Sequence, residues 1–279
     1  MPVAVPTTMD GVFEALAADP EAELMAGGTD FMVEVNFGHR RPLGVVALRS
    51  VSQLRAWRVE NEELVLGAGL TYTDLQTAEL ADLLPALAAA ARTVGSPQIR
   101  NAGTLGGNVA TASPAGDTLP VLVALDASIE LASSSGVRVV PWSEFFLGVK
   151  RTARRRDEVI TSVRVPVIDS RQDYLKVGTR NAMVISVAGL CLCVDFSHRA
   201  VRCGLGSVGP VPLRAPEAER WVEEQIDWDA RIVPDPRTHL RFGEMVADAA
   251  SPIDDHRSTA QYRRHAIGVL ARRALERLL

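Results

Sequence analysis

Residues 95–120 read GSPQIRNAGTLGGNVATASPAGDTLP, and the interpretation of the whole chain starts from them. The segment combines glycines with threonine, serine, asparagine and proline, a composition typical of loops and turns. A helix is predicted before it, at 82–94, and a β-hairpin after it, closed around residues 134–136. Structureless loops longer than about 15 residues usually have a function, so we expect a functional loop at 95–120.

The chemistry of this segment suits a phosphate-containing ligand. Glycines allow backbone N–H groups to approach an anion, and the hydroxyls of Thr104, Thr111 and Ser113 add donors. The carboxylate of Asp117 could accept hydrogen bonds from sugar hydroxyls. A nucleotide diphosphate fits this set of groups without any lysine. The alternative is a glycine-rich loop that packs only on itself.

A second glycine segment, AGGTDF at 26–31, follows a predicted short strand and precedes a predicted helical turn. A phosphate can bind exposed N–H groups at such a position, although a simple turn is the alternative. Neither segment is a Rossmann fingerprint or a P-loop, because GAGLTY at 67–72 lacks the third glycine and no GKS or GKT occurs. Ordinary NAD-binding and phosphate-transferring folds are therefore disfavoured.

Composition narrows the class of protein further. The 279 residues suggest roughly two domains at about 150 residues each. A net charge of −4 disfavours a nucleic-acid-binding protein. The longest charge-free apolar run, residues 184–194, is shorter than the roughly 18 residues of a membrane span. The chain start does not resemble a secretory signal, and three clustered cysteines suggest a reducing compartment, so we expect a cytoplasmic protein. The histidines show no zinc-ligand spacing, so no metal site is predicted.

The order of predicted elements indicates an α+β chain in three units. Residues 1–55 form a small α/β unit, with a helix at 8–18 and short strands at 23–28 and 44–50. Residues 56–172 form a larger α+β unit, in which Thr71 and Asp74 resemble a capping box that opens a helix. Residues 173–279 contain a three-stranded antiparallel meander followed by helices at about 216–226, 239–249 and 259–279.

The two glycine segments together resemble the flavin-binding subunit of the molybdenum hydroxylases. This family includes the flavin domain of xanthine dehydrogenase and the medium subunit of aerobic carbon monoxide dehydrogenase. The resemblance continues through YLKVGTRNAMVISVAG at 174–189, which is similar to the family's Lys-x-x-x-Arg strand. It extends to SPIDDHRSTAQYRRHAIGVLARRAL at 251–275, which is similar to the closing helix, and so covers nearly all of the chain.

The resemblance implies one non-covalently bound FAD between the first two units, which form a two-part FAD-binding domain. The two glycine segments would hold the pyrophosphate, Asp117 would accept hydrogen bonds from ribose or ribityl hydroxyls, and Ile160 would pack against the flavin or adenine. Lys176 would approach the edge of the isoalloxazine and stabilise its reduced anion; an exposed surface lysine is the alternative. The implied FAD-binding residues are Met25, Ala26, Gly27, Gly28, Thr29, Asp30, Phe31, Thr104, Gly106, Gly107, Asn108, Thr111, Ser113, Asp117, Ile160 and Lys176. Asn181 stands after Arg180 where many relatives have a second arginine, which affects how the flavin is tuned.

The implied function is that of an oxidoreductase subunit that carries electrons and has no catalytic residues for substrate. In the family, substrate is hydroxylated at a molybdopterin centre on a large subunit, and electrons reach the FAD through 2Fe–2S clusters on a small subunit. The acceptor is NAD, a quinone or another carrier. A self-sufficient flavin oxidoreductase and a flavin-free assembly protein are the alternatives.

Two further groups of residues need an interpretation. Cys191, Cys193 and Cys203 lie in predicted strands and are interpreted as small core residues, since an iron–sulfur cluster normally needs four thiolates. The basic run at 151–156 is either a solvated loop or the rim of a surface that docks an acidic partner subunit.

Overall fold

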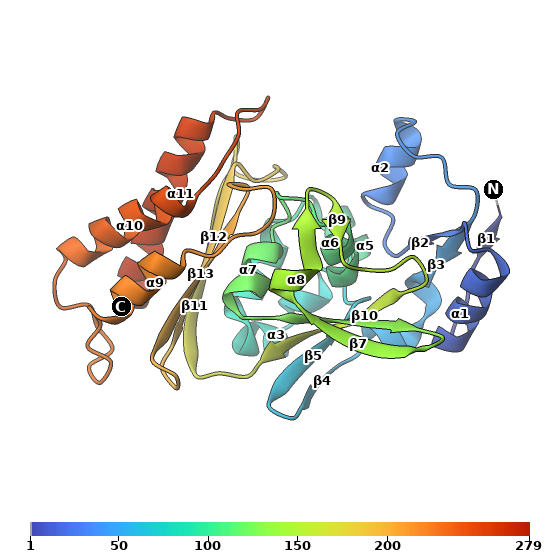
Figure 1. Cartoon of the computed structure of the whole chain (residues 1–279), viewed down its shortest axis with the longest axis horizontal. Helices are drawn as coiled ribbons and strands as arrows, with labels where there is room; N and C mark the ends of the chain where they lie inside the picture. Colours follow the sequence, from blue (N-terminus) through green and yellow to red (C-terminus); the bar gives the residue numbers. More distant parts are fainter. Residues whose placement is uncertain (1) are drawn as a thin grey trace.

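The structure is a computed structural model that describes residues 2–279. It contains three main sheets arranged along the long axis of the molecule, with helices between and beside them (Figure 1). The expected α+β fold with an antiparallel three-stranded sheet near the C-terminus is confirmed. The helices within residues 2–279 lack the combination of length and apolar character required to cross a bilayer.

The first sheet is parallel and has the order β1–β3–β2, formed by Val3–Ala4, Val45–Ala47 and Glu23–Met25. Helix α1, Met9–Ala18, begins at Thr8, whose hydroxyl accepts a hydrogen bond from the N–H of Gly11. Helix α2, Phe31–Asn36, begins at the last residue of the AGGTDF segment, in agreement with the predicted helical turn. Two short 3₁₀ helices, Leu48–Ser50 and Ser52–Arg55, connect this sheet to the second one.

The second sheet is antiparallel, with the order β4–β5–β10–β6–β7. Its strands are Trp57–Glu60, Glu63–Gly67, Val159–Pro166, Ser128–Ser133 and Gly136–Pro141. The predicted hairpin is confirmed as β6 and β7. A short helix, α8 at Trp142–Phe145, and a small hairpin of β8, Phe146–Gly148, with β9, Arg151–Thr152, complete this part.

The segment that precedes residues 95–120 departs from its prediction. The helix predicted at 82–94 is two helices, α3 at Ala78–Leu83 and α4 at Pro85–Thr93, because Pro85 has no N–H to donate and fits only at a helix start. The capping box at residues 71–74 is present with both reciprocal hydrogen bonds, but it opens the 3₁₀ helix Asp74–Gln76.

The prediction of a long loop at 95–120 is also wrong. Most of this segment is helical: α5 spans Pro97–Ala102, α6 spans Leu105–Thr111, and α7 begins at its end and spans Leu119–Ala124. The hydroxyls of Ser96 and Thr104 cap α5 and α6 by accepting hydrogen bonds from N–H groups in the first turn. These short helices hold the glycine-rich residues in one defined conformation.

The third sheet is the predicted meander of β11, Ser170–Val177, β12, Ala188–Asp195, and β13, Ala200–Gly206. Helices α9, Pro216–Glu223, and α11, Ala260–Leu278, cover one face, α10, Arg237–Ala249, packs against these two helices, and α4 and α7 cover the other face (Figure 1). Strand β12 is therefore buried along its whole length. The three cysteines are fully buried in β12 and β13, which confirms them as core residues.

Candidate functional site

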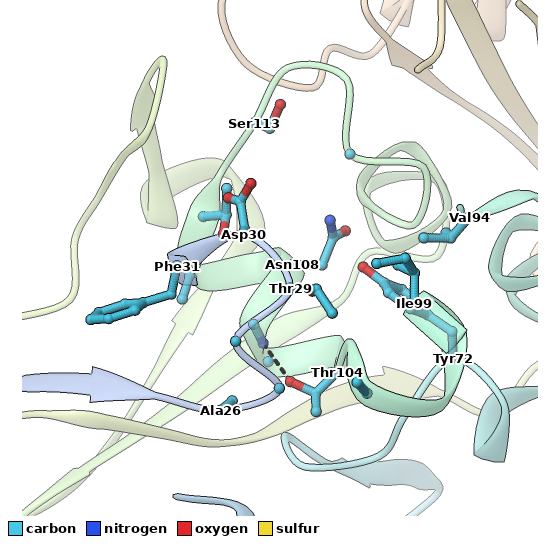
Figure 2. A pocket seen from close by; sticks show the side chains of 18 of the residues that line it. Ala26, Thr29, Asp30, Phe31, Tyr72, Val94, Ile99, Thr104, Asn108 and Ser113 are labelled. Carbon is cyan, nitrogen blue, oxygen red and sulfur yellow. Dashed lines mark hydrogen bonds between the residues drawn. The ribbon is translucent and has the colours of Figure 1, made fainter. Parts of the chain in front are cut away.

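A cavity of about 830 Å³ lies where the first sheet, helices α5 and α6, and the loop before β12 come together. Figure 2 shows the first glycine segment, with Ala26, Thr29 and Asp30, running past the N-terminal end of α6. The structure brings to this cavity all the predicted site residues except Lys176: Met25, Ala26, Gly27, Gly28, Thr29, Asp30, Phe31, Thr104, Gly106, Gly107, Asn108, Thr111, Ser113, Asp117 and Ile160.

The first glycine segment presents its backbone to this cavity. Strand β2 ends at Met25 and α2 begins at Phe31, so residues 26–30 form the turn between them. Gly28 has a φ of +71°, which favours glycine. Within residues 2–279, the backbone N–H groups of residues 26–31 make no intramolecular hydrogen bond. A run of unpaired N–H groups at a cavity wall is suited to an anionic ligand.

Close packing requires Gly27. A Cβ atom at this position would lie 1.7 Å from the carbonyl oxygen of Ala102, the last residue of α5. The two glycine-rich segments, which are distant in sequence, are thus in direct backbone contact. The cavity wall can form only because no side chain separates them.

The second glycine segment uses its backbone differently. The N–H groups of Leu105 and Gly106 donate to the carbonyls of Leu70 and Ala68, and that of Gly107 donates to the Thr104 hydroxyl at 3.0 Å (Figure 2). A Cβ at Gly106 would lie 2.5 Å from the Cβ of Ala68, so this glycine allows α6 to pack against the end of β5. A Cβ at Gly107 would be crowded by a single atom, the Thr104 hydroxyl oxygen at 2.9 Å.

Polar side chains supply the remaining donors near α6. The Thr118 hydroxyl donates to Oδ1 of Asn108 at 2.6 Å, which leaves the Asn108 amide N–H₂ available toward the cavity. Thr111 and Ser113 follow on the same wall. This set of neutral donors complements the unpaired N–H groups of the first segment.

Asp117 lies at the far end of the cavity wall, in a buried polar cluster. Its Oδ1 accepts a hydrogen bond from the Tyr174 hydroxyl at 3.0 Å, and its Oδ2 lies 2.6 Å from Nζ of Lys176. Lys176 also donates to the carbonyl of Thr93 at 3.3 Å. Burial raises the pKa of Asp117, and Lys176 and Tyr174 offset only part of that effect. The partners of Asp117 are therefore side chains of a distant strand and not the local backbone.

Lys176 does not line the cavity. Its side chain is only 8% exposed, so the alternative of an exposed surface lysine is wrong. Its Nζ is held instead in a buried ion pair with Asp117, which does line the cavity.

Several cavity residues have no counterpart in the prediction. Tyr72, Val94 and Ile99 form an apolar side of the cavity (Figure 2). Burial raises the pKa of Tyr72, which keeps its hydroxyl neutral. These three residues carry no local signal, because apolar side chains in short elements look like ordinary core residues.

Charged residues also surround the cavity. Lys150, one of only two lysines in the chain, lies 2.5 Å from Glu34 of α2, and Glu34 also pairs with Arg40. Arg154 lines the cavity and donates to the Glu158 carbonyl, so this member of the basic run at 151–156 is not a simple surface residue.

Metal-ligating side chains do not gather in the described part of the chain. Within residues 2–279, no group of three or more histidine, cysteine or carboxylate side chains is placed to hold a metal ion. Burial raises the pKa values of all three cysteine thiols, which keeps them protonated.

Comparison with known proteins gives consistent matches over the whole chain. Residues 1–168 match the family described as the FAD binding domain in molybdopterin dehydrogenase, and residues 173–278 match the CO dehydrogenase flavoprotein C-terminal domain. The carbon monoxide dehydrogenase medium chain of Afipia carboxidovorans is 31% identical over 92% of this chain and 88% of its own length. The xanthine dehydrogenase FAD-binding subunit of Escherichia coli O157:H7 is 28% identical over 96% and 92%, respectively.

A solved structure supports the same assignment. The reconstituted CO dehydrogenase from Oligotropha carboxidovorans contains a chain that superimposes with a TM-score of 0.90 at 27% identity, covering 100% of this chain and 97% of that chain. The glycine segments, the cavity between them and these matches agree with one another. The chain therefore belongs to the family of FAD-binding subunits of molybdopterin dehydrogenases.

Proposed function

We propose that this chain binds one FAD non-covalently in the cavity and acts as the electron-transfer subunit of a multi-subunit molybdenum-containing dehydrogenase. The observation that carries the proposal is the run of unpaired backbone N–H groups at residues 26–31, beside a cavity that the second glycine segment also lines. The match to a family of FAD-binding domains supports it.

The residues present suit the chemical parts of FAD. The N–H groups of residues 26–31 would hold the pyrophosphate, with the side chains of Thr104, Asn108, Thr111 and Ser113 as neutral donors. Asp117 would accept hydrogen bonds from ribose or ribityl hydroxyls, and Ile160, which is buried on β10, would give a ring an apolar contact. FAD, when bound, supplies two-electron redox chemistry, and the chain's contribution is to orient and tune it.

The partners form a second part of the proposal. The relatives from Escherichia coli and Afipia carboxidovorans are named as a subunit and a medium chain, which supports a role for this chain beside other subunits. We infer a small partner with 2Fe–2S clusters and a large partner with the molybdopterin centre. Electrons would leave the FAD for NAD, a quinone or another carrier.

Purification tests this function directly. The full chain should be yellow and show the absorbance bands of a flavin, and denaturation should release FAD, since the link is non-covalent. It should not oxidise an organic substrate without the partner subunits. A colourless protein that never binds added FAD would instead favour an assembly protein. Turnover of an organic substrate by the chain with FAD as its only redox centre would favour a self-sufficient oxidoreductase.

Substitutions at two neighbouring glycines distinguish an effect on ligand binding from an effect on the stability of the fold. Gly107→Val should leave the chain folded but strongly reduce its FAD content, because the added side chain meets only the Thr104 hydroxyl and otherwise extends toward the cavity. Gly106→Val is the matched comparison and should lower the Tm, because its side chain would collide with Ala68. FAD content and thermal melts of both variants provide the measurement. Normal FAD content in Gly107→Val would contradict the placement of the ligand.

A further inference from the structure

The ion pair between Asp117 and Lys176 joins parts of the chain that are 59 residues apart. Lys176 lies on β11 of the third sheet, and Asp117 lies in the turn that precedes α7. Both side chains are 8% exposed, so the 2.6 Å contact is largely shielded from water. A second β11 side chain, Tyr174, donates to the other carboxylate oxygen. Strand β11 thus holds both oxygens of Asp117.

Only Asp117 of this cluster lines the cavity, while Lys176 and Tyr174 lie behind it. An ionised carboxylate has about four acceptor positions, and these two partners occupy two of them. The remaining positions are available to hydrogen-bond donors in the cavity. The Asp117 carboxylate accepts the strongest hydrogen bonds when it is ionised, because hydrogen bonds to a charged group are stronger than hydrogen bonds between neutral groups.

We propose that Lys176 is a positioning residue for the cofactor: it keeps Asp117 ionised and oriented so that the carboxylate accepts hydrogen bonds from hydroxyl groups of FAD. This inference rests on the proposed FAD-binding function. The role proposed here acts through Asp117, the ion-pair partner of Lys176, and it is separate from the contact with the isoalloxazine edge that the family resemblance implies.

The electrostatic surroundings of Asp117 support this role. The titratable groups that face it are Lys176 and Tyr174 from β11 and Tyr72 from the segment after β5, and Cys191 of β12 lies next to Tyr174. Burial raises the pKa values of both tyrosines and of the cysteine, so these groups are neutral near pH 7. Lys176 is therefore the only cation in this set.

Removal of Lys176 should raise the pKa of Asp117. Burial already raises the pKa of Asp117, and Lys176 is the strongest influence that lowers it. Without the lysine this pKa rises further, so the carboxyl group is protonated at low pH and ionises again only as the pH increases. FAD binding should then become dependent on pH, because the protonated group loses part of its acceptor capacity.

The test is a titration of the full chain, stripped of FAD, with added FAD between about pH 6 and pH 9. The wild-type affinity should change little across this range. Lys176→Met should bind FAD about 10- to 100-fold more weakly at the acidic end, the range expected for a lost hydrogen bond to a charged group. Its affinity should approach the wild-type value at the alkaline end.

Three further variants separate positioning from a purely structural role. Lys176→Arg keeps the positive charge and should retain a flat pH profile. The double variant Lys176→Met with Asp117→Asn removes both charges and should bind weakly at every pH. Arg202→Met breaks another buried pair of the same sheet, with Asp195, and should lower the Tm without changing the pH profile.

The outcomes distinguish this inference from the proposed function. A Lys176→Met profile parallel to that of the wild type, or a pH dependence that persists in the double variant, would overturn the role of Lys176. If Lys176→Met does not fold, the Lys176→Arg variant tests the proposal instead. An FAD affinity that depends on pH in Lys176→Arg contradicts the proposal, and an affinity that does not change with pH supports it. Failure of the wild-type chain to bind FAD at any pH would instead overturn the proposed function.

Discussion

Replacement of Gly27 by alanine is expected to weaken FAD binding about 100-fold. The added Cβ would lie 1.7 Å from the Ala102 carbonyl oxygen, and neither backbone can yield without moving the first glycine segment away from α5. Overpacking of this kind costs roughly 3 kcal/mol or more. If this free energy opposes formation of the conformation that binds FAD, the affinity for FAD drops about 100-fold. Titration of the FAD-free variant with FAD measures this loss.

Gly11→Ala is a matched control, because it adds the same methyl group to the same N-terminal unit. The nearest atoms to its Cβ lie 3.3 Å away, and alanine is favoured over glycine in a helix such as α1. FAD affinity should be unchanged in this variant. Wild-type affinity in Gly27→Ala would show that the contact with α5 is not needed for cofactor binding.

Replacement of Gly204 by alanine is expected to destabilise the protein as a whole. This residue lies on β13, and its Cβ would be 1.8 Å from the carbonyl oxygen of Pro120 in α7. The helix could then no longer pack flat against the third sheet. A cost on the order of 3 kcal/mol would lower the Tm by about 6–12 °C for a chain of this size. Thermal unfolding of the full chain measures the shift.

Gly206→Ala provides the graded comparison on the same strand. Its Cβ would approach a side-chain atom of Pro120 at 3.1 Å, so a small adjustment can relieve the contact. We expect a much smaller change in Tm than for Gly204→Ala. Equal melting temperatures for the two variants would contradict the packing described for α7.

Much of the fold follows from local patterns. The strand predicted at 159–166 is β10, and the hairpin around residues 134–136 and the antiparallel meander are both present. Alternation and turn residues are local properties, so the sequence reveals them. The helices between residues 95 and 124 were missed, because each has only six or seven residues and little helical periodicity. Tertiary contacts, such as that of Gly106 with Ala68, stabilise helices this short.

Many of the residues that line the cavity could be predicted because they belong to two contiguous motifs, whereas Tyr72 and Val94 lie outside both motifs. What those residues do could not, because a motif does not show how its hydrogen-bonding groups are used. Both segments are rich in glycine, yet the first leaves its N–H groups unpaired and the second donates its own to Leu70, Ala68 and Thr104. That difference arises only when α6 packs against the end of β5.

The sequence therefore determines which chemical groups the chain can offer to a ligand. The tertiary structure determines which charged side chains form ion pairs, because that depends on how the sheets pack together. Glycines, hydroxyls and Asp117 indicate a phosphate-containing ligand through their residue types and spacing, and the family resemblance of the two segments implies FAD. The contacts of Lys176 with Asp117 and of Lys150 with Glu34 span 59 and 116 residues. No local pattern encodes such distances, because the partners meet only after burial of apolar surface has brought the separate sheets together.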